Sequence, residues 1–176
     1  MPRLDALRDA LPDHARDTRL NLPAVLGEGT SLSPAQRWGV AVAVAAGLRD
    51  KALTDALAAD ALEAGVTEAT LADAYSAASI MAMNNVYYRF RHLVGKPSYR
   101  EKPPRLRMNA LGRPASSKVD LELFCLAVSA VNGCGDCVTS HEATLLQSGA
   151  TEDQVHDAVR VAAVVHAATV ARALAG

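Results

Sequence analysis

The residues best suited to chemistry lie between Asn132 and His141, in the run Asn-Gly-Cys-Gly-Asp-Cys-Val-Thr-Ser-His. Two of the chain's three cysteines, Cys134 and Cys137, stand three residues apart there, and an imidazole follows one helical turn after the second. On a helix, Cys137 and His141 would share one face, close enough for the imidazole to take the thiol proton. The spacing therefore predicts a dithiol with its own base.

The residues before this run extend the predicted site. Gly133 indicates a helix end, which places Cys134 at the start of the next helix, where unpaired amides and the helix dipole favour a thiolate. Glu122, twelve residues before Cys134, could orient His141 directly or through water, although a solvated position at the edge of its apolar face is the alternative. In a reducing compartment, a Cys-x-x-Cys pair indicates catalysis or metal binding rather than a permanent structural bridge.

Length and composition predict the scaffold. A chain of 176 residues is enough for about one domain, and its 50% hydrophobic but only 4% aromatic composition favours closely packed helices over strands. The net charge of -1 argues against a nucleic-acid partner. Because the N-terminus has no signal pattern and no apolar run is long enough to span a membrane, we expect no membrane association and a cytoplasmic location.

Helix-start and helix-forming patterns cover most of the chain, and no alternating strand pattern interrupts them. Leucines recur at helical spacing between positions 4 and 11, and Ser33-Pro34 predicts a capped helix start. Further helices are expected over 51–64, 68–83 and 152–174, and after Ser117, where Asp120 would complete a short capping box. Glycines and prolines over 94–117 predict an irregular connector. The predicted fold class is all-α.

The two sides of this connector are related. Leu62-Glu-Ala-Gly-Val-Thr-Glu68 and Leu146-Gln-Ser-Gly-Ala-Thr-Glu152 repeat at an offset of 84 residues, with each Gly placed as a C-cap and each Thr as the next N-cap. We therefore predict a single domain, residues 1–176, with related helical halves over 34–93 and 118–176. Only the second half carries the reactive groups. A chance coincidence of helix-boundary residues is the alternative.

The pattern Glu122, eleven residues, Cys134-Gly-Asp-Cys137, three residues, then His141-Glu142 resembles the alkyl hydroperoxide reductase D family. The resemblance spans nearly the whole chain and includes Leu20-Asn-Leu22, Met81-Ala-Met-Asn-Asn-Val-Tyr-Tyr-Arg89, Leu106-Arg-Met-Asn109 and Ala130-Val-Asn-Gly-Cys134. It implies the all-helical fold of the carboxymuconolactone decarboxylase-like superfamily, with the active site in the second of two related halves. It also implies a homotrimer.

The resemblance assigns roles to four residues. Cys137 would attack the peroxide and pass through a sulfenic acid, Cys134 would supply a proton and close an intramolecular disulfide, and His141 and Glu122 would relay protons. One position departs from the pattern. Asp136 stands where some family members carry a histidine, so a second imidazole is not expected beside the cysteines, and the acidic group disfavours a thiolate.

The function implied is that of an antioxidant peroxidase. It would reduce organic (alkyl) hydroperoxides and recycle a peroxiredoxin of the AhpC type, with electrons from dihydrolipoamide supplied by a lipoylated dehydrogenase component. Since no phosphate-binding glycine loop is found, no tightly bound cofactor is expected. Two alternatives remain: an adaptor that passes electrons from lipoamide to the peroxiredoxin with little peroxidase activity of its own, and a zinc site. The zinc ligands would be Cys134, Cys137, His141 and Glu122.

Other residues carry weaker predictions. Cys125, amid apolar neighbours, is expected to be a small buried hydrophobe, and His92 to be exposed and not a ligand. Asn84-Asn85 fits either a pocket wall or a helix end. From Arg89 to Lys118, nine Lys or Arg residues accompany a single Glu, which suits an acidic partner or anionic donor, but equally a solvated loop or a subunit contact.

Overall fold

A computed structural model describes residues 1–175, and within them every regular element is a helix. The all-α prediction is therefore confirmed. The elements in chain order are α1 (Pro2–Asp9), the 3-10 turn η1 (Asp13–Ala15), α2 (Arg16–Leu26), α3 (Pro34–Gly47), α4 (Lys51–Glu63), α5 (Glu68–Val94), α6 (Pro97–Arg100), η2 (Asn109–Gly112), α7 (Lys118–Val131), α8 (Gly135–Gln147) and α9 (Glu152–Leu174).

Helices α3 and α7 lie against each other at the centre of the molecule, and α5 and α9 each pack on both of them. Helix α4 covers α3 and contacts α1, while α8 covers α7 and contacts α5. The two central helices are buried along most of their length, because Ala and Val in α3 and Leu and Phe in α7 face neighbours on several sides. This arrangement gives the motif after α7 a rigid support.

The helices of the two halves correspond in order and in spacing. Helices α7, α8 and α9 each begin 84 residues after α3, α4 and α5 respectively. Their junctions correspond too, since Arg49 and Gly133 both have a positive φ, of 64° and 66°, as do Gly65 and Gly149, of 84° and 88°. The residues that follow Arg49 and Gly133 also correspond. Asp50 caps α4, and Cys134 occupies the N-cap of α8.

The predicted caps are mostly confirmed. The Ser33 side chain forms a full capping box with Gln36, and Thr67 and Thr151 cap α5 and α9 through their hydroxyls. The capping box predicted at Ser117 is only half formed. Ser117 accepts the amide hydrogen of Asp120, but the Asp120 carboxylate is engaged by the Gln36 side chain at 3.0 Å instead of returning to the cap. A bond between helices replaces the local one.

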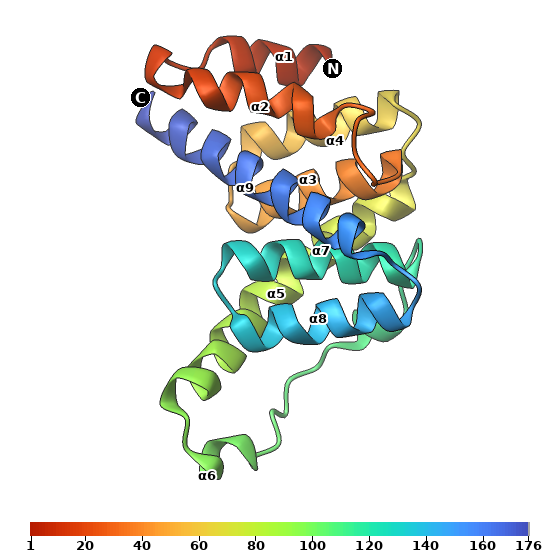
Figure 1. The fold of residues 1–176 in the computed structure, drawn as a ribbon, viewed down its shortest axis with the longest axis vertical. Helices are drawn as coiled ribbons and strands as arrows, with labels where there is room; N and C mark the ends of the chain where they lie inside the picture. The colour runs from red at the N-terminus through yellow and green to blue at the C-terminus, as the bar shows by residue number, and fades with distance from the viewer. Residues whose placement is uncertain (176) are drawn as a thin grey trace.

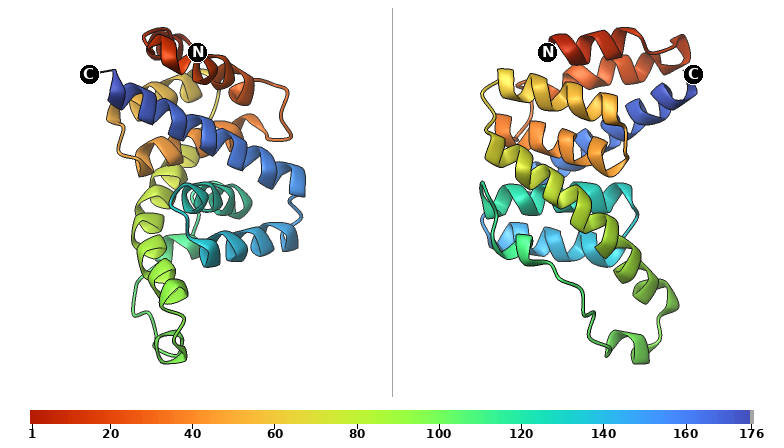
Figure 2. Two further views of the ribbon diagram at one scale, coloured as in Figure 1. Left: turned by 60° about the vertical axis from the view of Figure 1, so that its left-hand side comes forward. Right: turned by 180° about the vertical axis from the view of Figure 1, so that it is seen from behind.

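The connector differs from its prediction in two ways. Helix α5 does not stop near Met83 but continues to Val94, and the connector itself contains the short helices α6 and η2. As a result, the end of α5 and α6 project from the body as an arm, and the following segment returns toward α8 (Figure 1). Both chain termini lie at the opposite end of the molecule from this arm (Figures 1 and 2).

Candidate active site

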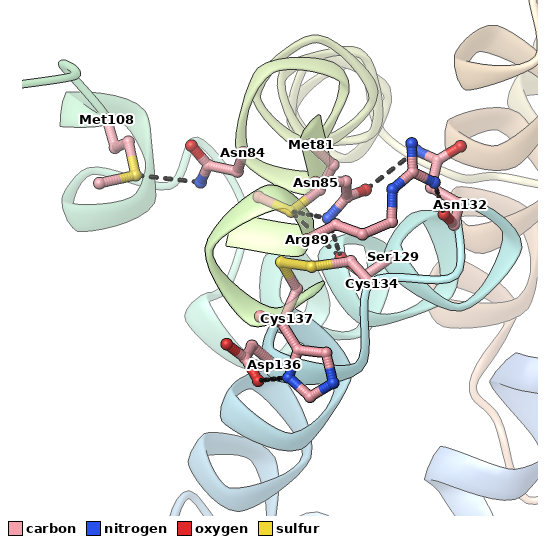
Figure 3. The surroundings of a disulfide bond; sticks show 11 residues. Met81, Asn84, Asn85, Arg89, Met108, Ser129, Asn132, Cys134, Asp136 and Cys137 are labelled. Atoms are coloured by element: carbon pink, nitrogen blue, oxygen red, sulfur yellow. Dashed lines mark hydrogen bonds and ion pairs between the residues drawn. A yellow bond between two sulfur atoms is a disulfide. The ribbon is translucent and has the colours of Figure 1, made fainter. Parts of the chain in front are cut away.

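The cysteine motif occupies the junction between α7 and α8. Gly133 turns the chain with a φ of +66°, which lets α7 end and places Cys134 at the N-cap of α8, as predicted. Cys134 and Cys137 are joined in a disulfide, with their Cα atoms 5.3 Å apart (Figure 3). The motif follows a helix rather than a strand, which separates it from the thioredoxin type of dithiol.

The two sulfur-bearing residues differ in their access to solvent. Cys134 is fully buried, whereas Cys137 is 6% exposed and lines a cavity of about 370 Å³ between α5, α8 and the returning connector. The residues that line this cavity are Asn84, Tyr88, Met108, Leu111, Asp136, Cys137, Ser140 and His141. A small molecule that enters this space meets Cys137, with Cys134 behind it.

His141 and Glu122 are brought together by the packing of α8 on α7. The His141 Nδ1 and Glu122 Oε2 atoms lie 2.6 Å apart, and the two side chains are only 12% and 11% exposed. Because an ionised carboxylate can only accept a hydrogen bond, Nδ1 carries the hydrogen and Nε2 of a neutral imidazole is left as the acceptor. Glu122 thus points inward, not into solvent. In this disulfide form, the described residues include no hydrogen bond between His141 and Cys137.

A buried polar network supports the motif from behind. Asn85 on α5 donates to the Ser129 hydroxyl at 2.9 Å and accepts from the Asn132 side chain at 2.9 Å, and the Ser129 hydroxyl donates to the Met81 sulfur at 3.3 Å (Figure 3). The Ser129 carbonyl in turn accepts the amide hydrogen of Cys134. The network ties α5 to the last turn of α7, which fixes where Cys134 begins α8.

Asn84 and Asn85 both lie within α5 and not at its end. Of the two predicted roles, that of a pocket wall is the one that applies to Asn84. Asn84 is 5% exposed, lines the cavity beside Cys137, and donates its amide to the Met108 sulfur at 3.0 Å, while its carbonyl oxygen has no partner among residues 1–175. Met108 comes from the connector. This contact helps to hold the connector over the cavity.

The structure adds a contact that the sequence analysis did not predict, between a second imidazole and Asp136. His92, near the end of α5, places its Nδ1 atom 2.7 Å from the Asp136 carboxylate, the residue between the two cysteines. Both side chains are about half exposed, His92 by 52% and Asp136 by 45%. The sequence could not indicate this pair because His92 precedes Asp136 by 44 residues and no spacing relates them.

The third cysteine does not belong to the site. Cys125 is fully buried in the core, as predicted, and burial raises its pKa far above the ordinary thiol value, as do, to a lesser extent, the nearby carboxylates of Glu122 and Asp73. Among residues 1–175, no group of three or more His, Cys, Asp or Glu side chains is arranged to hold a metal ion. Within the same residues, no helix combines the length and apolar character that a bilayer crossing requires.

Comparison with known proteins gives consistent matches. The family profile described as carboxymuconolactone decarboxylase matches residues 97–176, which include the whole motif. Alkyl hydroperoxide reductase AhpD of Anaeromyxobacter dehalogenans is 65% identical over 176 residues, which cover 100% of this chain and 94% of that protein. Proteins of the same name from Rhodospirillum centenum and Rhizorhabdus wittichii are 48% and 46% identical, over 93% and 98% of this chain and 87% and 98% of theirs.

Proposed function

We propose that this chain, which belongs to the AhpD family of alkyl hydroperoxide reductases, reduces alkyl hydroperoxides by cycling Cys134 and Cys137 between dithiol and disulfide. One observation carries the proposal. Cys137 opens onto a cavity of about 370 Å³ beside an imidazole whose proton positions are set by Glu122, and Cys134 lies buried within disulfide distance behind it.

In the first step, the Cys137 thiolate attacks the terminal oxygen of the hydroperoxide. An S–O bond forms, the O–O bond breaks, and the departing alkoxide takes a proton and leaves as the alcohol. His141 is suited to receive the Cys137 thiol proton at Nε2 and return it to the alkoxide, and the Glu122 carboxylate stabilises the imidazolium in between. Apolar cavity walls such as Leu111 and Met108 suit the alkyl group of the substrate.

In the second step, the Cys134 sulfur attacks the Cys137 sulfenic acid. An S–S bond forms, the S–O bond breaks, and the hydroxyl leaves as water with the proton that Cys134 gives up. The sum is one hydroperoxide and two thiols converted to one alcohol, one water and one disulfide. The disulfide form described above corresponds to the end of this half-cycle.

We assign the return to the dithiol to thiol–disulfide exchange with dihydrolipoamide on a lipoylated dehydrogenase component, and include an AhpC-type peroxiredoxin as a partner that the dithiol recycles. A soluble dithiol donor needs no bound cofactor in this chain. Exchange is reasonable at Cys137, since an attacking thiolate must reach a sulfur and Cys137 is the one that lines the cavity. We also propose a homotrimer, as the family resemblance implies, and a cytoplasmic location, as the sequence pattern predicts.

The test is hydroperoxide consumption by the purified protein with dihydrolipoamide, with and without an AhpC-type peroxiredoxin. Turnover by the protein alone that is lost in Cys137→Ser and Cys134→Ser, but kept in the buried control Cys125→Ala, is the expected result. Turnover only with the peroxiredoxin present would favour the adaptor alternative. If neither mixture consumes hydroperoxide, the proposed reaction is wrong.

A further inference from the structure

The pair formed by His92 and Asp136 joins two elements at the mouth of the cysteine site. Asp136 lies in the first turn of α8, directly before Cys137, and lines the same cavity. His92 reaches it from the last turn of α5 at 2.7 Å. The contact therefore places a second imidazole next to Asp136, the residue directly before Cys137.

The negative charge of Asp136 disfavours a thiolate at Cys137, and the contact with His92 can offset this effect. A carboxylate one residue from Cys137 repels a thiolate there, and a thiolate is the reactive form of the thiol. Three other charged side chains near the motif are engaged elsewhere: Glu122 with His141, Arg89 with the Asn132 carbonyl, and Arg91 with the Arg100 carbonyl and over the rings of Tyr87 and Tyr88. Among the described residues, His92 is the basic group in contact with Asp136.

We infer that His92 is a positioning residue for the dithiol, which acts through Asp136: its imidazole binds and offsets the Asp136 carboxylate and so permits Cys137 to react as a thiolate. The inference deepens the proposed function and rests on it for its biological purpose. A histidine supplied by α5 thereby compensates for an aspartate in the position between the cysteines. His92 does not itself touch a sulfur, and its effect is on the charge beside Cys137.

The inference predicts that substitution of His92 and substitution of Asp136 have opposite effects on the reactivity of Cys137. Without His92, Asp136 is left unpaired and the Cys137 thiolate is disfavoured. Without the Asp136 charge, His92 is no longer needed. A contact that only fastens α5 to α8 would behave differently, because either single substitution would break it and the double substitution could not restore it. A double-mutant cycle separates the two cases.

The experiment uses the reduced full-length protein with the variants His92→Gln, Asp136→Asn and the double variant, and His156→Gln as an exposed-histidine control. The readouts are the rate of Cys137 alkylation by iodoacetamide at pH 7, with the site identified by mass spectrometry, and the dithiol–disulfide equilibrium constant in glutathione buffers. Neither readout uses a peroxide, so failure of the proposed peroxidase reaction would leave this test intact.

For His92→Gln we expect alkylation about threefold to tenfold slower, and an equilibrium shifted toward the disulfide by a similar factor, as suits the loss of one imidazole contact to the Asp136 carboxylate in a partly exposed site. Asp136→Asn should match or exceed the unsubstituted protein, and the double variant should recover to within about twofold of Asp136→Asn. Unchanged values for His92→Gln, or a double variant as slow as His92→Gln, would overturn the inference, and unchanged circular dichroism would exclude loss of folding.

Discussion

At the residue scale, the hydrogen bond between Glu122 and His141 decides which imidazole nitrogen is free for chemistry. Both side chains are nearly buried, so water competes little for this bond. An ionised Glu122 holds the hydrogen on Nδ1 and favours the imidazolium that forms when Nε2 takes a proton. The spacing of the sequence predicted the i,i+4 relation of Cys137 and His141, but the inward direction of Glu122 required the packing of α7 on α8.

Glu122→Gln keeps the size of this side chain and an acceptor for Nδ1, but removes the charge that stabilises the imidazolium. We expect the rate of Cys137 oxidation by tert-butyl hydroperoxide to fall by about 10- to 100-fold, the range for loss of an orienting partner. Stopped-flow measurement of sulfenic acid formation tests this. The control is Glu142→Gln on α8, adjacent to His141; an equal loss in both variants would contradict the role of the Glu122 charge.

Cys137 and Cys125 should differ in reactivity because only Cys137 lines a cavity, whereas Cys125 is enclosed in the core. Burial raises the pKa of Cys125, so this thiol stays protonated and inaccessible at pH 8. We expect native alkylation of the reduced protein to label Cys137, which lines the cavity, but not Cys125, and alkylation in guanidinium chloride to label all three cysteines. Intact-protein mass spectrometry counts the labels. Native labelling of Cys125 at the rate of Cys137 would contradict its place in the core.

At the element scale, local patterns predicted helix ends better than helix lengths. Caps and positive-φ glycines depend on a few adjacent residues, and those at Ser33, Thr67 and Gly149 were visible in the sequence. The extension of α5 to Val94 was not, because the alanine-rich pattern that predicted this helix ends near Met83 and gives way to aromatic and basic residues. Helix α6 was hidden for a similar reason, since Pro97 indicated irregular chain yet serves as a first-turn proline.

The close approach of α3 and α7 depends on Gly39. A Cβ atom at this position would lie 2.1 Å from the Phe124 Cζ atom, and the Phe124 ring is fully buried and cannot swing into solvent. We expect Gly39→Ala to lower the free energy of unfolding by about 1–3 kcal/mol through overpacking, measured by urea denaturation.

Two further variants test this cause. Gly29→Ala, where an added Cβ atom meets nothing within 4 Å, is the control and should change stability little. Adding Phe124→Leu to Gly39→Ala should cost less than the sum of the two single variants, because the smaller side chain makes room. Additive losses would show that the contact with Phe124 is not the reason for the effect.

In both halves, a buried carboxylate holds the loop that precedes a central helix. Asp157 on α9 accepts from the amide and hydroxyl of Ser31 before α3, and Asp73 on α5 accepts in the same way from Ser116 before α7. Burial alone would raise the pKa of Asp157, but the bonds from Ser31 and Arg160 outweigh it and lower the pKa below the ordinary 3.8. The two carboxylates fasten corresponding helix starts to the opposite half.

The lowered pKa fixes how stability depends on pH. Asp157 contributes fully above its unfolded-state value near 3.8, and the contribution disappears as pH falls through the lower folded-state value. Asp157→Asn should therefore destabilise the protein by about 1–3 kcal/mol at pH 7 and by less at pH 3, which lies below the unfolded-state value. Urea denaturation at both pH values measures the difference. An equal loss at pH 7 and pH 3 would mean that the charge of Asp157 is not involved.

At the scale of the whole molecule, the arm formed by the end of α5 and by α6 is notable because little of the rest of the chain covers it. It projects from a body in which α3 and α7 are well covered (Figure 2). The part of α5 that leads into this arm exposes apolar side chains. Val86, Phe90 and Leu93 are 62%, 46% and 75% exposed and recur at i, i+4 and i+7, so they form one stripe along α5. A stripe of this kind is typical of a surface that another protein covers.

The proposed homotrimer offers an occupant for this stripe, because a second copy of the chain would bury the apolar side chains. We expect Leu93→Glu to dissociate the assembly to monomers, since a subunit contact cannot bury an unpaired carboxylate without a large cost. Light scattering after size exclusion at micromolar concentration measures the mass. Leu20→Glu is the matched control, because Leu20 is 63% exposed on α2, far from the arm. A trimer that survives Leu93→Glu would place the contact elsewhere, and a monomeric unsubstituted protein would refute the trimer itself.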